Sequence, residues 1–181
     1  MSKSNKKIII TLIFFAIVSL LYFKEPLFIA KLKYPIQYQS QVIKFSNDYN
    51  VDKNLVFSVI KAESNFYLYS KSRKNAMGLM QILDTTWNWG CSELNTVSTD
   101  YYDINQNIEI GTWYLNKLIN EFGREEIAIM AYNAGSGNVK SWIDQGLLSG
   151  NDYKTWDIPF KETRDYLDKV MTYKNKYNEI Y

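Results

Sequence analysis

The chain has 181 residues, of which 46% are hydrophobic and 22% charged, with a net charge of +2; these values fit one globular domain with a core of its own. It contains no histidine, which excludes Ser-His-Asp and Cys-His catalysis and histidine-ligated zinc. The single cysteine, Cys91, cannot form an internal disulfide or a cysteine-based metal site. The small positive excess comes from lysines before residue 31, so no basic stripe remains for nucleic acid.

The N-terminal segment combines lysines with an apolar run. Residues 8–23 contain only Thr11 and Ser19 as polar residues. As a helix this run spans about 24 Å, slightly less than a typical hydrocarbon core, and Lys7 and Lys24 at its ends can extend toward the headgroups. We therefore predict that residues 1–30 form a membrane anchor with a single pass, which leaves the rest of the chain outside.

A cleaved signal peptide is the alternative for the same segment. Cleavage needs small residues three positions apart, and residues 28–30 after the run offer only Ala30. The sequence thus favours an uncleaved anchor at the cell membrane, while a secreted protein with a cleaved signal stays open. In both cases the rest of the chain is expected to be exported from the cytoplasm.

The rest of the chain predicts a mostly α fold, with at most a small β element near residues 68–82. A linker at 31–39 is expected to precede a compact domain at 40–181, with a loop at 90–103. Apolar periodicity, capping residues and glycine or proline breaks predict its helices. The expected helices begin near Ile36, run from Asp52 to Glu63, include Trp87, cover 104–122 and 124–132, include 139–143, and begin again at Pro159.

Glu63 stands at the end of the most apolar of these helices. Asp52 is a good N-cap residue, and Glu63 lies one turn beyond Val59 on the inward face. Burial and the negative end of the helix dipole both favour the neutral form of a carboxyl group there. A neutral carboxyl group at pH 7 is what a general acid needs. The alternative is that Glu63 is simply the first exposed residue after a core helix.

Three blocks of sequence then occur in a fixed order. The first joins E-S-N-F at 63–66 to G-L-M-Q at 78–81, the second joins 107–115 to A-Y-N-A-G at 131–135, and the third is I-P-F-K-E-T-R-D-Y at 158–166. Together they closely resemble the catalytic domain of the soluble lytic transglycosylases, a lysozyme-like (α+β) fold that cleaves peptidoglycan. The resemblance covers roughly residues 40–178.

The resemblance implies roles for individual residues. Glu63 would be the single catalytic acid and base. Six further residues would line the cleft or support the substrate: Ser72, Gln81, Tyr132, Asn133, Glu162 and Tyr166. For Ser72 a place on the loop surface, and for Tyr166 a place in the core, remain alternatives.

This chain departs from the family pattern at two places. After G-L-M-Q the family commonly has Met and then Pro, where this chain has Leu83 and Asp84. Leu for Met is a volume-conserving change. The spacer at 71–74 is K-S-R-K, where the family is often richer in small residues. The loss of the Pro should loosen the entry to the next helix without touching the chemistry. The spacer bears on substrate preference and not on the reaction.

The implied reaction needs one carboxyl group. An N-acetyl group beside the anomeric carbon can stabilise the positive centre, so no second protein carboxylate is required. The predicted activity is cleavage of the MurNAc–GlcNAc bond of peptidoglycan to an anhydromuramic product, without a metal or cofactor. The expected partners are glycan strands and, through the N-terminal helix, the membrane; no nucleic acid is expected, and no protein partner for envelope assembly is identified.

Two other functions stay open. A goose-type lysozyme-like hydrolase would use water and leave a reducing end, so product analysis separates it from a transglycosylase. A membrane-anchored scaffold would bind glycan strands without cutting them. An intact Glu63 argues against the scaffold.

Overall fold

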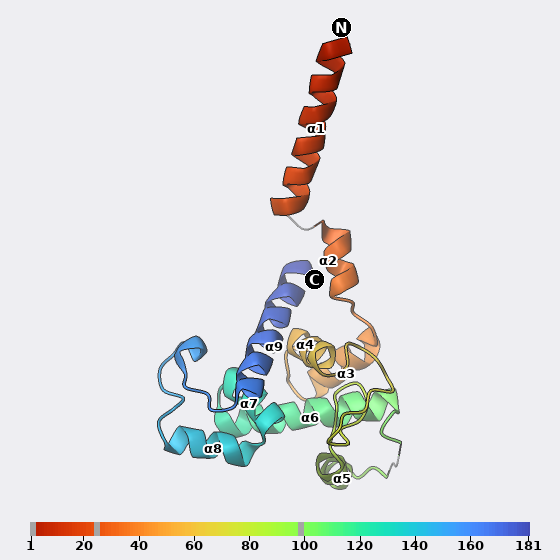
Figure 1. Cartoon of the computed structure of the whole chain (residues 1–181). Helices are drawn as coiled ribbons and strands as arrows, with labels where there is room; N and C mark the ends of the chain where they lie inside the picture. The colour runs from red at the N-terminus through yellow and green to blue at the C-terminus, as the bar shows by residue number, and fades with distance from the viewer. Residues whose placement is uncertain (1–2, 24–25, 98–99) are drawn as a thin grey trace. The chain divides into compact units, whose positions relative to one another are not determined.

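The computed structural model describes residues 3–23, 26–97 and 100–181 (Figure 1). It is mostly helical, and the described residues form no strand, which confirms the predicted fold class. The chain divides into two compact units, one up to Pro35 and one from Ile36 onward. Each unit is described here by itself.

The first unit contains α1 (Lys3–Phe23) and α2 (Leu27–Lys33). The large apolar side chains between Ile8 and Val18 of α1 are exposed. Within the described ranges, no helix combines the length and the apolar character needed to cross a membrane. The structure therefore confirms a helix in this segment, whereas attachment to a membrane stays a prediction. Lys24, expected at the membrane boundary, lies outside the described residues.

The predicted linker is not wholly irregular, because α2 reaches into it. Pro26 occupies the N-cap position of α2, and the helix ends before Pro35. A residue that precedes proline is disfavoured in the helical region, which accounts for the non-helical Tyr34 after the helix. The predicted boundary at residue 30 falls within this helix.

The second unit is built around α6 (Ile104–Phe122), which packs against α3, α5 and α7 (Figure 1). Its start and end were predicted from the sequence, and both are confirmed. The Asp103 carboxylate accepts a hydrogen bond from Gln106 N at 2.9 Å, and Gly123 ends the helix with φ of 68°. The other helices are α3 (Gln39–Asp48), α4 (Lys53–Glu63), α5 (Asp84–Glu93), α7 (Glu125–Ala134), α8 (Ser136–Asp144) and α9 (Lys161–Ile180), with a 3-10 turn at Tyr153–Thr155.

Helix α4 has the buried face and the cap that the sequence predicts. The Asp52 carboxylate accepts a hydrogen bond from Asn54 N at 2.8 Å. Every residue from Leu55 to Ile60 is buried, and Glu63 is the last residue of the helix. Burial of this apolar face fixes the position of the carboxyl group that follows it.

The loop between α4 and α5 is held by α6. It contains only isolated bridges, Lys71 to Met77 and Met77 to Ile82, which is the small β element expected near 68–82. The fully buried Asn107 side chain accepts from Met80 N at 2.8 Å and donates to Met77 O at 3.0 Å and to Tyr101 O at 2.9 Å. A side chain at Gly111 would place its Cβ 2.4 Å from Met80 Sδ. The loop therefore lies directly on α6.

Several predicted helix boundaries differ from the structure; α7, for example, ends at Ala134 rather than at residue 132. Helix α3 begins at Gln39, after Tyr38 with φ of 55°, and α9 begins at Lys161, because Phe160 is still extended. Helix α5 continues to Glu93, so the predicted loop at 90–103 is partly helical. Gly90, where the predicted loop begins, lies within this helix and packs so closely on α6 that an added Cβ would lie 2.8 Å from Ile110. Tertiary packing overrides the local preference here.

We predict that Asn107→Ala lowers the free energy of unfolding by about 3 kcal/mol, because it leaves buried backbone groups without partners. Urea denaturation measures the change. Asn120→Ala, at an exposed position of the same helix, is the matched control and should change stability by less than about 0.5 kcal/mol. Equal effects at both positions would contradict the proposed role of Asn107.

Candidate active site

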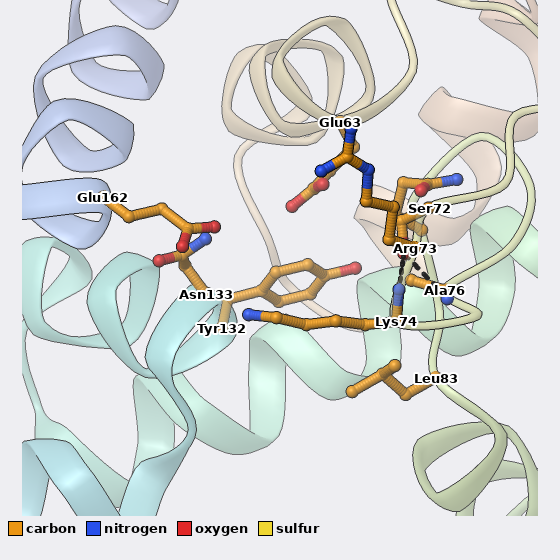
Figure 2. Close-up of a pocket in the computed structure, with 10 residues that line it drawn as sticks. Glu63, Ser72, Arg73, Lys74, Ala76, Leu83, Tyr132, Asn133 and Glu162 are labelled. Atoms are coloured by element: carbon orange, nitrogen blue, oxygen red, sulfur yellow. Dashed lines mark hydrogen bonds between the residues drawn. The ribbon is translucent and has the colours of Figure 1, made fainter. Parts of the chain in front are cut away.

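A cavity of about 360 Å³ lies at the C-terminal end of α4 (Figure 2). Its walls come from the end of α4, the following loop, the end of α7 and the first turn of α9. The lining residues are Glu63, Ser72, Arg73, Lys74, Ala76, Gln81, Leu83, Tyr132, Asn133 and Glu162. The structure thus brings together six of the seven residues predicted for the site. Tyr166, the seventh, lies behind the cavity wall.

Glu63 is half-buried at the cavity wall. Burial raises the pKa of its carboxyl group from 4.5 to about 7, and the charge of Glu162 acts in the same direction. A hydrogen bond from Tyr166 and the charge of Lys169 act against this rise. Near neutral pH the carboxyl group therefore populates both protonation states, as an acid that also acts as a base requires. The predicted desolvation of Glu63 is confirmed.

Tyr166 is buried, with 8% of its surface exposed, and its hydroxyl group donates a hydrogen bond to Glu63 Oε1 at 2.7 Å. Burial holds the pKa of this phenol well above its usual value, so the hydroxyl stays a donor. The reading of Tyr166 as a core residue is thus confirmed, whereas a role toward the substrate stays a prediction. Tyr166 contacts the acid with its hydroxyl group, whereas its ring belongs to the core.

Tyr132 and Asn133 bring the end of α7 into the wall. The Tyr132 hydroxyl donates to Met80 O at 2.8 Å, which joins α7 to the loop. Asn133 Oδ1 accepts from the Thr163 hydroxyl at 2.8 Å, which joins α7 to α9. Burial holds the pKa of Tyr132 well above its usual value, and the charge of Glu63 acts in the same direction, as expected for a tyrosine that lies near the carboxyl group.

Gln81 and Ser72 each have one hydrogen-bonding group left for a ligand. Gln81 Nε2 donates to Ser70 O at 3.0 Å and to Gly78 O at 2.9 Å, so its amide oxygen is left to meet a ligand. Ser72 Oγ accepts from Lys74 N at 3.2 Å and from Ala76 N at 3.0 Å, as the dashed lines in Figure 2 mark. Its hydroxyl hydrogen is left to donate. Ser72 therefore lines the cavity and also shapes the turn.

Sequence reasoning missed several residues of the site. Lys169 donates to Ala62 O at 2.8 Å and lowers the pKa of Glu63. Its position, three residues after Tyr166 on the same helix, was a signal that could have found it. Arg73, Lys74 and Ala76 were seen only as a spacer. The described residues contain no group of three or more side chains suited to hold a metal ion.

Comparison with known proteins decides the family. The family model described as "Transglycosylase SLT domain" matches residues 40–150. The chain belongs to the transglycosylase SLT domain family. It is also similar to the 70 kDa soluble lytic transglycosylase of Escherichia coli, with a TM-score of 0.76 and 27% identity over 83% of this chain and 25% of the other. The likeness to that structure and the helical architecture confirm the lysozyme-like SLT fold that the sequence blocks predict.

The chain is also similar to proteins that are named lytic murein transglycosylases. The chain is 32% identical to "Membrane-bound lytic murein transglycosylase C" of Edwardsiella ictaluri, over 80% of this chain and 47% of that protein. It is 30% identical to "Soluble lytic murein transglycosylase" of Salmonella typhimurium, over 82% of this chain and 24% of that protein. The chain thus spans less than half the length of either relative.

We predict that Glu63→Gln makes the SLT domain more stable above pH 7, by up to about 3 kcal/mol. The folded-state pKa near 7 exceeds the unfolded value near 4.5, so the unfolded state gives up its proton first as the pH rises. Stability from the neutral carboxyl is therefore complete below pH 4.5 and is lost between pH 4.5 and 7.

Urea denaturation of wild type and variant at pH 4, 6 and 8 measures this prediction. Glu93→Gln removes an exposed carboxylate and is the control. The stability difference should grow with pH for Glu63→Gln and stay nearly constant for the control. A constant difference for Glu63→Gln would contradict a raised pKa.

Proposed function

We propose that this SLT domain is a peptidoglycan lytic transglycosylase that cleaves the MurNAc–GlcNAc bond with Glu63 as its single acid and base. The observation that carries the proposal is a carboxyl group with a pKa of about 7 at the wall of a cavity. The names of its relatives supply the substrate class, because those proteins are described as lytic murein transglycosylases.

The first proposed step is proton donation. Neutral Glu63 gives its proton to the glycosidic oxygen, and the bond from this oxygen to the anomeric carbon breaks. The carbonyl oxygen of the N-acetyl group then bonds to that carbon and stabilises its positive charge. The glutamate becomes ionised, a state that the hydrogen bond from Tyr166 and the charge of Lys169 both favour.

The second proposed step returns the proton. Ionised Glu63 removes the proton from the primary hydroxyl group of the same sugar, and the freed oxygen attacks the anomeric carbon. The bond to the N-acetyl oxygen breaks, an anhydro ring closes and Glu63 is neutral again. Because burial favours the neutral form and Tyr166 and Lys169 favour the ionised form, neither proton transfer is strongly uphill.

Hydrolysis is the second candidate, and Glu162 is the observation that favours it. This carboxylate lines the same cavity as Glu63 and acts on its pKa. If Glu162 activated a water molecule, the pair would work as in a glycoside hydrolase with two carboxylates. The product would then carry a reducing end in place of an anhydro ring.

We further propose that α1 attaches the chain to the membrane and that the SLT domain works on the outer side. Three observations support this: the apolar side chains of α1 are exposed, lysines flank its apolar run, and two relatives are named as membrane-bound. Removal of the segment as a signal would instead release the domain. Fractionation of cells that express the full chain distinguishes a membrane-bound from a released protein.

We predict that Glu63→Gln reduces cleavage of purified peptidoglycan by several orders of magnitude, because the amide cannot give or take a proton. Mass spectrometry of the released fragments measures it. The variant should still bind glycan strands in co-sedimentation. Near-normal cleavage would remove Glu63 from this role, and a wild type that binds without cleaving would indicate the scaffold.

We predict that wild type releases anhydromuramic ends and that Glu162→Gln keeps them as the product. In a transglycosylase Glu162 supports the substrate, so its loss lowers the rate without changing the product. Release of reducing ends by wild type, abolished in Glu162→Gln, would instead establish the hydrolase. The same mass spectra decide between the two.

A further inference from the structure

Two positive side chains in the cavity have no role in the reaction described above. Arg73 and Lys74 line the cavity and are exposed. Within residues 3–23, 26–97 and 100–181, the structure shows no ion pair or side-chain hydrogen bond for either. Both charges are therefore available to a ligand.

These charges are separate from the control of Glu63. The groups that set the pKa of Glu63, besides its burial, are Tyr166, Lys169 and Glu162. Lys169 donates to a backbone carbonyl of α4, and Glu162 forms no ion pair with Arg73 or Lys74. Removing the charge of Arg73 or Lys74 therefore leaves the hydrogen bond and the charges around the acid in place.

The turn that carries the two side chains is held by hydrogen bonds between backbone N–H groups and Ser72. Ser72 Oγ accepts hydrogen bonds from the backbone N–H groups of Lys74 and Ala76, and Asn75 adopts a φ of 60°. Figure 2 shows the Lys74 side chain extended from this turn toward Tyr132 and Asn133. A fixed turn lowers the backbone entropy that this loop loses when it binds a ligand.

Lys74 also lies where two cavities meet. A second cavity of about 270 Å³ includes Tyr114 and Gly135. The residues shared by both cavities are Lys74, Gln81, Leu83, Tyr132 and Asn133. A ligand longer than one sugar ring that occupies both cavities passes directly beside the ammonium group of Lys74.

We propose that Arg73 and Lys74 bind a carboxylate carried by the muramoyl residue and so make this enzyme select strands that are anionic there. The inference rests on the proposed function and specifies its substrate. Arginine can hold a carboxylate through two parallel hydrogen bonds, and lysine adds a point charge. A neutral strand in the same place would desolvate both cations without a partner, which is unfavourable.

Two parts of the substrate can supply the carboxylate. A muramoyl residue without its peptide has a free lactyl carboxylate, whereas a residue that keeps its peptide has carboxylates along the stem. The test uses three glycan preparations: strands with peptides, strands stripped of peptides by an amidase, and stripped strands whose carboxyl groups are converted to amides. The last preparation removes the anion and keeps the sugar chain.

The test variant is the double substitution Arg73→Gln and Lys74→Gln in the full chain. We expect its KM to rise about tenfold on the preparation that supplies the carboxylate, because a hydrogen bond to a charged group contributes that much. We expect kcat to change by less than about twofold, since the acid is untouched. On amide-converted strands wild type and variant should have the same KM.

Lys71→Gln is the matched control. Lys71 is exposed in the same loop and does not line the cavity, so its substitution removes one positive charge from the loop without the same effect. A KM effect in only one of the two anionic preparations identifies the source of the carboxylate. Equal KM values for wild type and double variant on every preparation, or an equal loss for the control, would overturn the inference.

Failure of the inference is distinguishable from failure of the proposed function. If wild type cleaves all strands and the double variant has the same KM values, the proposed function is supported and the carboxylate site is ruled out. If wild type cleaves no strand, the function falls, and co-sedimentation of each preparation with wild type and double variant still decides the carboxylate site. A loss of kcat rather than a rise in KM would also contradict the binding role.

Discussion

The hydrogen bond from the Tyr166 hydroxyl to Glu63 Oε1 joins the last residue of α4 to the first turns of α9, across most of the length of the domain's sequence. It counteracts the burial that raises the pKa of Glu63, and without such a partner this pKa would be higher. The bond forms only if both helices are placed correctly. The core beneath the two helices therefore sets the distance between the Tyr166 hydroxyl group and the Glu63 carboxyl group.

The sequence predicted most helices because their signals are local. Asp52 and Gly123 act through their own backbone neighbourhood, and each caps or ends a helix as expected, while Asp103 caps α6 in the same local way. The errors occur where a distant contact decides. The loop predicted from residue 90 onward is helical to Glu93, where Gly90 fits closely against Ile110, and the loop over α6 depends on Asn107, whose hydrogen bonds cannot be read from its position.

The site could be predicted where sequence motifs carry it. Glu63, Gln81, Tyr132 and Asn133 lie within recognisable blocks, and the structure brings them to one cavity. Residues whose contribution depends on long-range electrostatics were not found. Lys169 reaches the acid from the third turn of α9, and the orientation of Arg73 and Lys74 depends on a turn that only the folded loop defines.

The family match covers residues 40–150 and thus ends before α9 begins. Yet α9 supplies Glu162, Tyr166 and Lys169, which between them set the electrostatic surroundings of the acid. A fragment that ends where the family match stops would keep Glu63 but would lack the α9 residues that act on its pKa. Helix α9 therefore tunes the proton affinity of Glu63 although it lies outside the residues that the family model matches.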